Sequence, residues 1–185
     1  RQRQMCIRDR VLLCQNQTGY RNLVKLVSLA SLEGFYHKPR VDWELLTQYH
    51  EGLICLSGCL AGEIPRLLSE GSYEAAKEKA LQYQRFFGQE NYYLELQNHG
   101  IAEQQRILPL LLRISRETGI PVAATNDAHY IAKKDAAMQD VLLCIQTGKT
   151  IQDPDGMHFE TQEFYLKSTE EMASLFRDVP EAITN

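Results

Sequence analysis

The sequence has 185 residues, of which 44% are hydrophobic and 24% are charged, and its formal net charge is −4. This composition excludes a disordered or collagen-like chain, and the length allows one domain with a sizeable core or two small ones. No apolar run approaches the roughly 20 residues that a membrane span needs, and the first residues lack the pattern of a signal peptide. We therefore expect a cytoplasmic protein without a membrane partner.

Residues 1–10 differ from the rest of the chain because four of them are arginines. A basic start is one way to contact nucleic acid. The stretch does not fit the pattern that follows it, however, and we predict that residues 1–10 are a non-native or disordered tail without a structural role.

From residue 11 onward, short apolar runs alternate with amphipathic stretches, which is typical of an α/β domain. In chain order we first predict a buried strand over 11–14, a helix over 18–33 capped by Thr18, a loop over 35–40 and a short helix capped by Asp42. An interior strand over 53–57 and two helices over 62–70 and 72–87 follow. The last predicted elements of this region are a strand over 92–96, a helix over 102–118 and a strand over 121–125. The inward face of the first helix is expected to carry Leu23, Leu26, Val27 and Ala30. This alternation favours a mostly parallel sheet or barrel.

The last third has a different pattern. We predict a helix over 135–146, a turn at Asp-Pro-Asp-Gly over 153–156, and a capping box of Ser168 and Glu171 that opens a helix over 169–176. The sequence thus predicts a domain over 11–135 followed by a helical extension over 136–185.

Polar residues follow three of the predicted strands. They are Ser57 to Cys59, Gln97 to His99, and the group Asn126, Asp127 and His129. Ligands collect at the carboxyl ends of parallel strands, so we expect these residues to converge on one rim.

Asp127 and His129 are two residues apart, so in an extended chain both side chains project to the same side. A carboxylate with an imidazole suits zinc, manganese or iron, although the same residues also suit a turn. The five cysteines are an odd number without paired spacing, which indicates free thiols. Cys59 would offer a thiolate ligand or would be a small buried residue, and His99 would contact the site or lie on the surface.

Several chemistries are excluded by missing motifs. The sequence contains no G-x-x-x-x-G-K-[ST] loop, no G-x-G-x-x-G loop and no G-x-S-x-G elbow. P-loop nucleotide hydrolases and serine hydrolases of the elbow type are therefore poor candidates.

The chain resembles one known family in a long, ordered series of segments. They are VLLCQNQTGYRNLVKL at 11–26, EGFYHKPRVDWELL at 33–46, EGLICLSGCLAGEIPRLL at 51–68, YYLELQNHGIAEQ at 92–104, GIPVAATNDAHYIAKKDAAMQDVLLCIQTGKTI at 119–151 and EFYLKSTEEMASLF at 163–176. They resemble the alpha subunits of bacterial DNA polymerase III, the replicative C-family DNA polymerases, in the later part of the polymerase-and-histidinol-phosphatase (PHP) domain.

The resemblance implies part of a distorted seven-stranded (β/α) barrel with a metal cluster at the strand ends. It transfers zinc or manganese ligation to Cys59, Asp127 and His129, and makes His99 a neighbour of the cluster. Asn126, beside Asp127, is a further candidate for a supporting or substrate contact, as is His99. The implied roles are metal-dependent 3′–5′ exonuclease proofreading or structural support of the polymerase. The implied partners of the parent protein are DNA, deoxynucleoside triphosphates, a proofreading exonuclease and the sliding clamp.

The sequence departs from the family pattern at both ends. The early H-x-H pair and further histidine and acidic ligands of the family cluster are absent, as are the paired aspartates that bind magnesium for nucleotide transfer. We therefore expect a replicase fragment without polymerase activity of its own. A free-standing PHP phosphoesterase and a non-catalytic interaction module are the alternatives, and the segment after residue 136 argues against the phosphoesterase.

Overall fold

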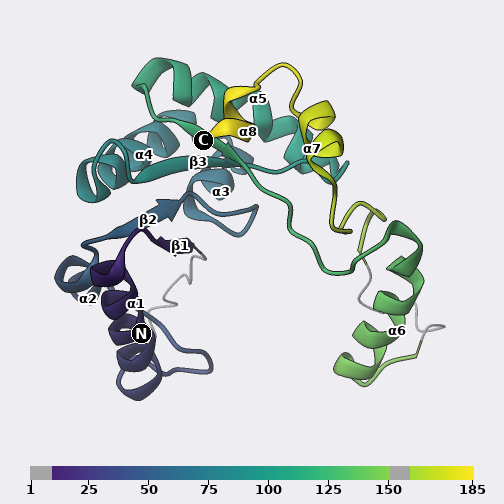
Figure 1. The fold of residues 1–185 in the computed structure, drawn as a ribbon, viewed down its shortest axis with the longest axis horizontal. Helices are drawn as coiled ribbons and strands as arrows, with labels where there is room; N and C mark the ends of the chain where they lie inside the picture. Colours follow the sequence, from purple (N-terminus) through teal and green to yellow (C-terminus); the bar gives the residue numbers. More distant parts are fainter. Residues whose placement is uncertain (1–9, 151–158) are drawn as a thin grey trace. The chain divides into compact units, whose positions relative to one another are not determined.

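The computed structural model of the chain describes residues 10–150 and 159–185 (Figure 1). It is a mixed α/β structure whose strands lie in the order β1-β2-β3-β4. The strands are β1 (Val11–Cys14), β2 (Leu53–Leu56), β3 (Tyr92–Leu96) and β4 (Val122–Ala124). The helices are α1 (Gln17–Leu32), α2 (Trp43–Tyr49), α3 (Glu63–Ser69), α4 (Tyr73–Phe87), α5 (Ala102–Thr118), the 3₁₀ turn η1 (Lys133–Asp135), α6 (Ala136–Thr147), α7 (Thr169–Leu175) and α8 (Glu181–Thr184). The predicted α/β class is confirmed.

The described chain divides into two compact units. The first contains the described residues up to Glu95 together with Leu110–Val122, and the second contains Leu96–Pro109 together with Ala123–Asn185. Helix α5 contributes residues to both units. None of the helices in the described ranges has the length and apolar character that a membrane crossing requires.

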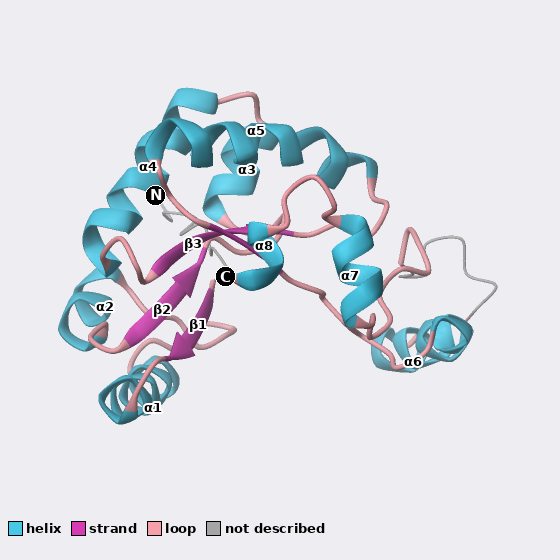
Figure 2. Ribbon diagram, turned by 45° about the horizontal axis from the view of Figure 1, so that its top comes forward, coloured by secondary structure: helices cyan, strands magenta, loops and turns pink. Residues whose placement is uncertain are grey.

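The sheet is mixed, whereas the alternation of elements predicts a mostly parallel one. Strand β1 pairs antiparallel with β2, opposing Val11 to Leu56, and β2 pairs parallel with β3, opposing Cys55 to Tyr92 (Figure 2). Helix α1 contacts both β1 and β2. Parallel strands need a crossover connection such as a helix, but antiparallel strands can also be joined through one. The helix between the two strands therefore did not determine whether they run parallel or antiparallel.

Strand β1 is exposed, although its apolar sequence predicts a buried strand. The side chains of Val11 and Leu13 are 40% and 48% exposed. In the described part of the chain β1 pairs only with β2, so no other described strand lies along its second edge. Apolar composition alone therefore did not determine burial, which depends on the neighbours of the strand.

Helix α1 begins earlier than predicted. Its cap is Asn16, whose side chain accepts a hydrogen bond from the Gly19 N–H at 3.0 Å, and not Thr18. A Cβ atom on Gly19 would lie 1.8 Å from the carbonyl oxygen of Gly52, so only glycine permits this approach of α1 to the start of β2. Leu26 and Ala30 face inward as predicted, but Val27 is 58% exposed.

The core of the first unit is formed by β2, β3, α3, α4 and the second half of α5. Its nearly inaccessible side chains include Leu53, Cys55, Ile64, Leu68, Ala76, Ala80, Tyr92, Leu94 and Ile114. Helices α3 and α4 pack together, and α4 also contacts β2. Asp42 caps α2 as predicted, accepting a hydrogen bond from the Leu45 N–H at 2.8 Å. The burial of β2 matches its prediction as an interior strand, and β3 forms the strand predicted over 92–96.

Arg10 is the one residue of the predicted tail within the described ranges. Its guanidinium forms an ion pair with Glu63 at 2.8 Å and lies 3.7 Å from the ring centroid of Tyr83. Residues 1–9 lie outside the described residues, so the assignment of 1–10 as a non-native or disordered tail stays a prediction. The described cysteines Cys14, Cys55, Cys59 and Cys144 are free thiols, as predicted.

The second unit contains the first half of α5 and most of the last third of the chain. Ser168 and Glu171 form the predicted capping box of α7, in which the Ser168 N–H donates to Glu171 at 2.8 Å and the Glu171 N–H donates to Ser168 Oγ at 3.2 Å. The predicted turn at 153–156 lies outside the described residues. The barrel and the helical extension over 136–185 stay predictions.

Candidate functional site

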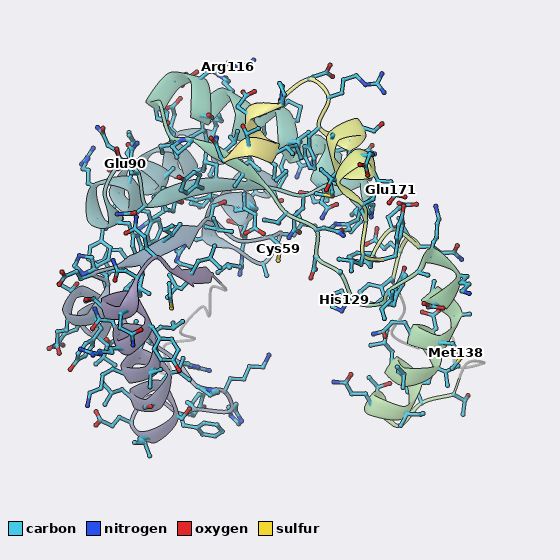
Figure 3. The ribbon with its side chains drawn as sticks, viewed as in Figure 1. Cys59, Glu90, Arg116, His129, Met138 and Glu171 are labelled. Atoms are coloured by element: carbon cyan, nitrogen blue, oxygen red, sulfur yellow. The ribbon has the colours of Figure 1, made fainter. Side chains whose placement is uncertain are left out.

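The loop after β2 is a tightly packed turn that carries Cys59. Ser57 is buried, and its hydroxyl accepts a hydrogen bond from the Glu95 N–H at 2.9 Å. Gly58 has φ +85°, and a Cβ atom on Gly62 would lie 2.4 Å from the Ser57 carbonyl oxygen. The glycines thus fold the chain back on itself, and Cys59 is left half-buried just before α3 (Figure 3).

The loop after β3 holds His99 in the interior, where its side chain is 1% exposed. Its N–H donates to Gln104 Oε1 at 2.8 Å, and its Nδ1 lies 3.1 Å from Gln104 Nε2. Because the amide oxygen of Gln104 already accepts, its amide nitrogen is the donor to Nδ1. Burial, followed by the charge of Lys167, lowers the pKa of His99 below its usual value of 6.5. His99 is therefore a neutral, buried histidine and not a surface residue of a loop.

The segment after β4 brings Asp127 and His129 together. His129 Nε2 lies 3.2 Å from Asp127 Oδ1, and the two side chains are 39% and 43% exposed. Asn126 Nδ2 donates to the Tyr165 carbonyl oxygen at 2.9 Å, and the Asn126 side chain acts to raise the pKa of His99. The charge of Asp127 opposes the lowering of the His99 pKa. Four of the five predicted site residues thus form one neighbourhood in the second unit, with the Asp127–His129 pair accessible to solvent.

The segment 163–166 also lies in this neighbourhood, although the sequence alone did not connect it with the site. The His129 N–H donates to the Phe164 carbonyl oxygen at 2.8 Å, and Tyr130 forms a parallel bridge with Tyr165. The run Glu-Phe-Tyr-Leu at 163–166 has the aromatic and apolar composition of a strand, and this is the signal that was available for it.

The donor atoms of Asp127 and His129 match part of the ligand set that a divalent cation needs. Ligand atoms at 2.0–2.2 Å from a tetrahedral zinc ion lie about 3.3 Å apart, close to the 3.2 Å between Asp127 Oδ1 and His129 Nε2. Within the described residues there is no group of three or more His, Cys, Asp or Glu side chains placed to hold one ion. Cys59 belongs to the first unit, whereas Asp127 and His129 belong to the second. The geometry therefore provides one pair of ligands and not a complete site.

Comparison with known proteins assigns the family. The sequence model of the PHP domain matches residues 5–99, just over half of the chain. The chain belongs to the PHP domain family. Cys59 and His99 lie within the matched residues, whereas Asn126, Asp127 and His129 lie beyond them.

The relatives of this PHP-family chain extend the similarity over nearly its whole length. It is 51% identical to DNA polymerase III subunit alpha of Treponema pallidum over 95% of the chain, and 48% identical to that of Borreliella burgdorferi over 95%. It is 44% identical to the corresponding subunit of Campylobacter jejuni over 96% of the chain. The chain spans 15%, 15% and 16% of the lengths of these relatives. The resemblance to bacterial DNA polymerase III alpha subunits is confirmed.

Proposed function

We propose that this chain is the PHP region of the catalytic alpha subunit of a bacterial replicative DNA polymerase. The identity to three such subunits over at least 95% of the chain supports this assignment. The parent protein would extend a primer on a DNA template with deoxynucleoside triphosphates, using magnesium held outside this segment. Its partners would include the sliding clamp and a proofreading exonuclease. The strands of this chain would form part of a (β/α) barrel.

Within that protein, the region would bind a divalent cation, zinc or manganese, through Cys59, Asp127 and His129. The observation that carries this proposal is the 3.2 Å separation of Asp127 Oδ1 and His129 Nε2 on the segment after β4. A cation bound there would activate water and stabilise the leaving oxygen in 3′–5′ hydrolysis of a phosphodiester.

The chain's own residues would prepare the ligands. Asp127 would supply a carboxylate oxygen and His129 its Nε2, and both side chains are partly exposed to solvent. Asn126 is anchored on the Tyr165 carbonyl oxygen, to which its Nδ2 donates at 2.9 Å. This fixes the residue next to Asp127 and limits the movement of its carboxylate, in the way that outer-shell partners orient metal ligands.

The test is cobalt(II) titration of the full chain, followed by absorption spectroscopy, with Asp127→Asn and His129→Gln as variants. His50→Gln is the matched control because His50 also packs against two phenylalanine rings and lies in the other unit. We expect each ligand variant to lose more affinity than the roughly 10–100-fold typical of outer-shell changes. The control should bind as the wild type does. Equal binding by all four proteins would refute the metal proposal.

A docking role is the second candidate, and helix α6 favours it. Its residues Met138, Leu142 and Ile145 are 65%, 56% and 72% exposed and recur at helical spacing on one face. An apolar stripe of this kind suits a groove on a protein partner such as a proofreading exonuclease. A 3′–5′ exonuclease assay on the parent polymerase separates the two roles. Activity that requires Asp127 and His129 supports hydrolysis, and activity that is absent in the wild type supports docking.

A further inference from the structure

The segment from Phe159 to Lys167 packs directly on the candidate site from a distant part of the sequence. Phe164 is 6% exposed, and its ring stacks on the His99 ring at a centroid distance of 4.4 Å and an interplanar angle of 3°. The same ring meets the His129 ring edge to face, at 5.8 Å and 75°. One aromatic side chain thus touches both histidines of the site.

The backbone of Phe164 is bound to the same segment that carries the donor pair. Its carbonyl oxygen accepts the His129 N–H at 2.8 Å and the Tyr130 N–H at 3.3 Å, and its own N–H donates to the Tyr130 hydroxyl at 3.3 Å. The Phe159 ring also contacts the His129 ring, at a centroid distance of 4.7 Å. Two aromatic rings therefore contact the His129 imidazole. Phe164 supplies one of these rings and also binds the main chain of His129.

Three further contacts anchor the segment. Thr161 Oγ1 donates to the His99 carbonyl oxygen at 2.6 Å, and Asn126 Nδ2 donates to the Tyr165 carbonyl oxygen at 2.9 Å. Lys133 and Glu163 form an ion pair. These contacts reach the loop after β3, the segment after β4 and the start of η1, so the segment joins the pieces of chain that surround the donor pair.

We propose that Phe164 is a positioning residue for the Asp127–His129 donor pair, and that the segment from Phe159 to Lys167 is a built part of the metal site. This inference rests on the proposed metal-binding function. A ligand that is held in place before the cation arrives loses less conformational freedom on binding, so affinity depends on the residues that hold it. Coupling is reciprocal: a cation bound at His129 strengthens the docking of the Phe164 segment, which links metal occupancy to the part of the chain leading toward α7.

The experiment compares Phe164→Leu with Phe87→Leu in the full chain. Phe87 is the matched control because it is also 6% exposed and also meets a histidine ring, that of His50, edge to face at 6.3 Å and 84°. Both variants remove an aromatic ring from a buried site. We expect Phe164→Leu to weaken cobalt(II) affinity by about tenfold, the lower end for outer-shell partners, and to change the visible absorption band of the bound ion. Phe87→Leu should change neither.

A second readout does not require metal. In metal-free protein, nuclear magnetic resonance of the imidazole C–H groups reports the ring currents of neighbouring aromatic side chains. Phe164→Leu should shift the signals of His99 and His129 and leave those of His50, and Phe87→Leu should do the reverse. Thr161→Val removes the hydroxyl that donates to the His99 carbonyl oxygen and accepts from the Glu163 N–H at 3.4 Å. It is the milder variant if Phe164→Leu does not fold, and should also weaken cobalt(II) binding.

The outcomes separate the two proposals. A wild type that does not bind cobalt(II) refutes the metal proposal, and with it the role of Phe164 toward a cation. Wild-type binding with equal losses in Phe164→Leu and Phe87→Leu means that general stability controls affinity, which overturns the positioning role alone. Unchanged His129 signals in metal-free Phe164→Leu overturn it as well.

Discussion

Each unit contains a histidine packed against two phenylalanine rings, and the two clusters differ in the group that the histidine ring nitrogen contacts. In the first unit, His50 lies 4.5 Å from Phe86 and 6.3 Å from Phe87. In the second, His129 lies 4.7 Å from Phe159 and 5.8 Å from Phe164. The ring of His50 contacts the Thr47 carbonyl through Nδ1 at 2.9 Å, whereas the ring of His129 meets the Asp127 carboxylate through Nε2.

The difference shows which feature is informative about function. Aromatic packing around a histidine occurs in both clusters, so it does not distinguish a structural histidine from a ligand. A carboxylate beside the imidazole occurs only in the second, and it is the combination that divalent transition metals prefer. The bond of His50 to a carbonyl of its own helix end is a local capping contact. The proposed metal site therefore depends on Asp127 more than on the rings that contact His129.

The prediction with the largest expected effect compares how tightly the phenylalanine rings of the two clusters are packed. Phe87 and Phe164 are each 6% exposed, so Phe87→Ala and Phe164→Ala should each lower the free energy of unfolding by about 3–5 kcal/mol through lost burial and the cavity left behind. Urea denaturation followed by circular dichroism measures both. A loss below about 1 kcal/mol for Phe164→Ala alone would mean that the second cluster is loosely packed, and the comparison with the first would no longer hold.

A smaller effect compares helix caps in the two units. Asp42 caps α2 in the first unit through one hydrogen bond, while Ser168 caps α7 in the second through a reciprocal pair with Glu171. Asp42→Ala and Ser168→Ala should each lower the free energy of unfolding by about 1 kcal/mol, since each leaves backbone N–H groups without their side-chain acceptor. Thermal denaturation of both variants checks this, and Thr18→Ala is the control because Asn16 caps α1. A larger loss in Thr18→Ala than in Asp42→Ala would contradict the assignment of the caps.

These caps also show what could be predicted from the sequence. Asp42 and Ser168 were predicted correctly as helix caps because each cap depends on residues no more than three apart. The side chains of Asp127 and His129 lie close together, as their spacing indicates, and their role as metal ligands stays a prediction. The exposure of β1 was not predicted, because it depends on which strands lie beside it. The antiparallel direction of β1 is also a property of the sheet and not of its four residues.

The role of Phe164 was missed for the same reason. Its contacts with His99 and His129 join residues 65 and 35 positions apart in the sequence, and the strand-like composition at 163–166 does not indicate which residues the segment contacts. The sequence located the donor atoms of the candidate site but not the side chains that hold them. Ligands are recognised by type and spacing, whereas supporting residues are ordinary apolar side chains whose importance comes from the fold.

The smallest expected effect concerns acid stability, and it compares one carboxylate in each unit. Lys77 and Arg113 lower the pKa of Glu117 in the first unit from 4.5 to about 2, and Lys133 lowers that of Glu163 in the second. A carboxyl whose pKa is lower in the folded state stabilises the fold above its unfolded pKa, and this contribution is lost as the pH falls toward the folded pKa. The advantage of wild type over Glu117→Gln should therefore shrink between about pH 5 and about pH 2.

The ion pairs of Glu117 are largely open to solvent, with side-chain exposures of 28–55%, so screening should keep this effect small and make it weaker still at high salt. Denaturation midpoints across that pH range, at low and high salt, measure it, with Glu90→Gln in the exposed loop between α4 and β3 as the control. Glu163→Gln should show the same sign, because Lys133 also favours its charged form. A stability difference for Glu117→Gln that is constant from neutral to acidic pH would mean that the side chain acts through packing and not through its charge.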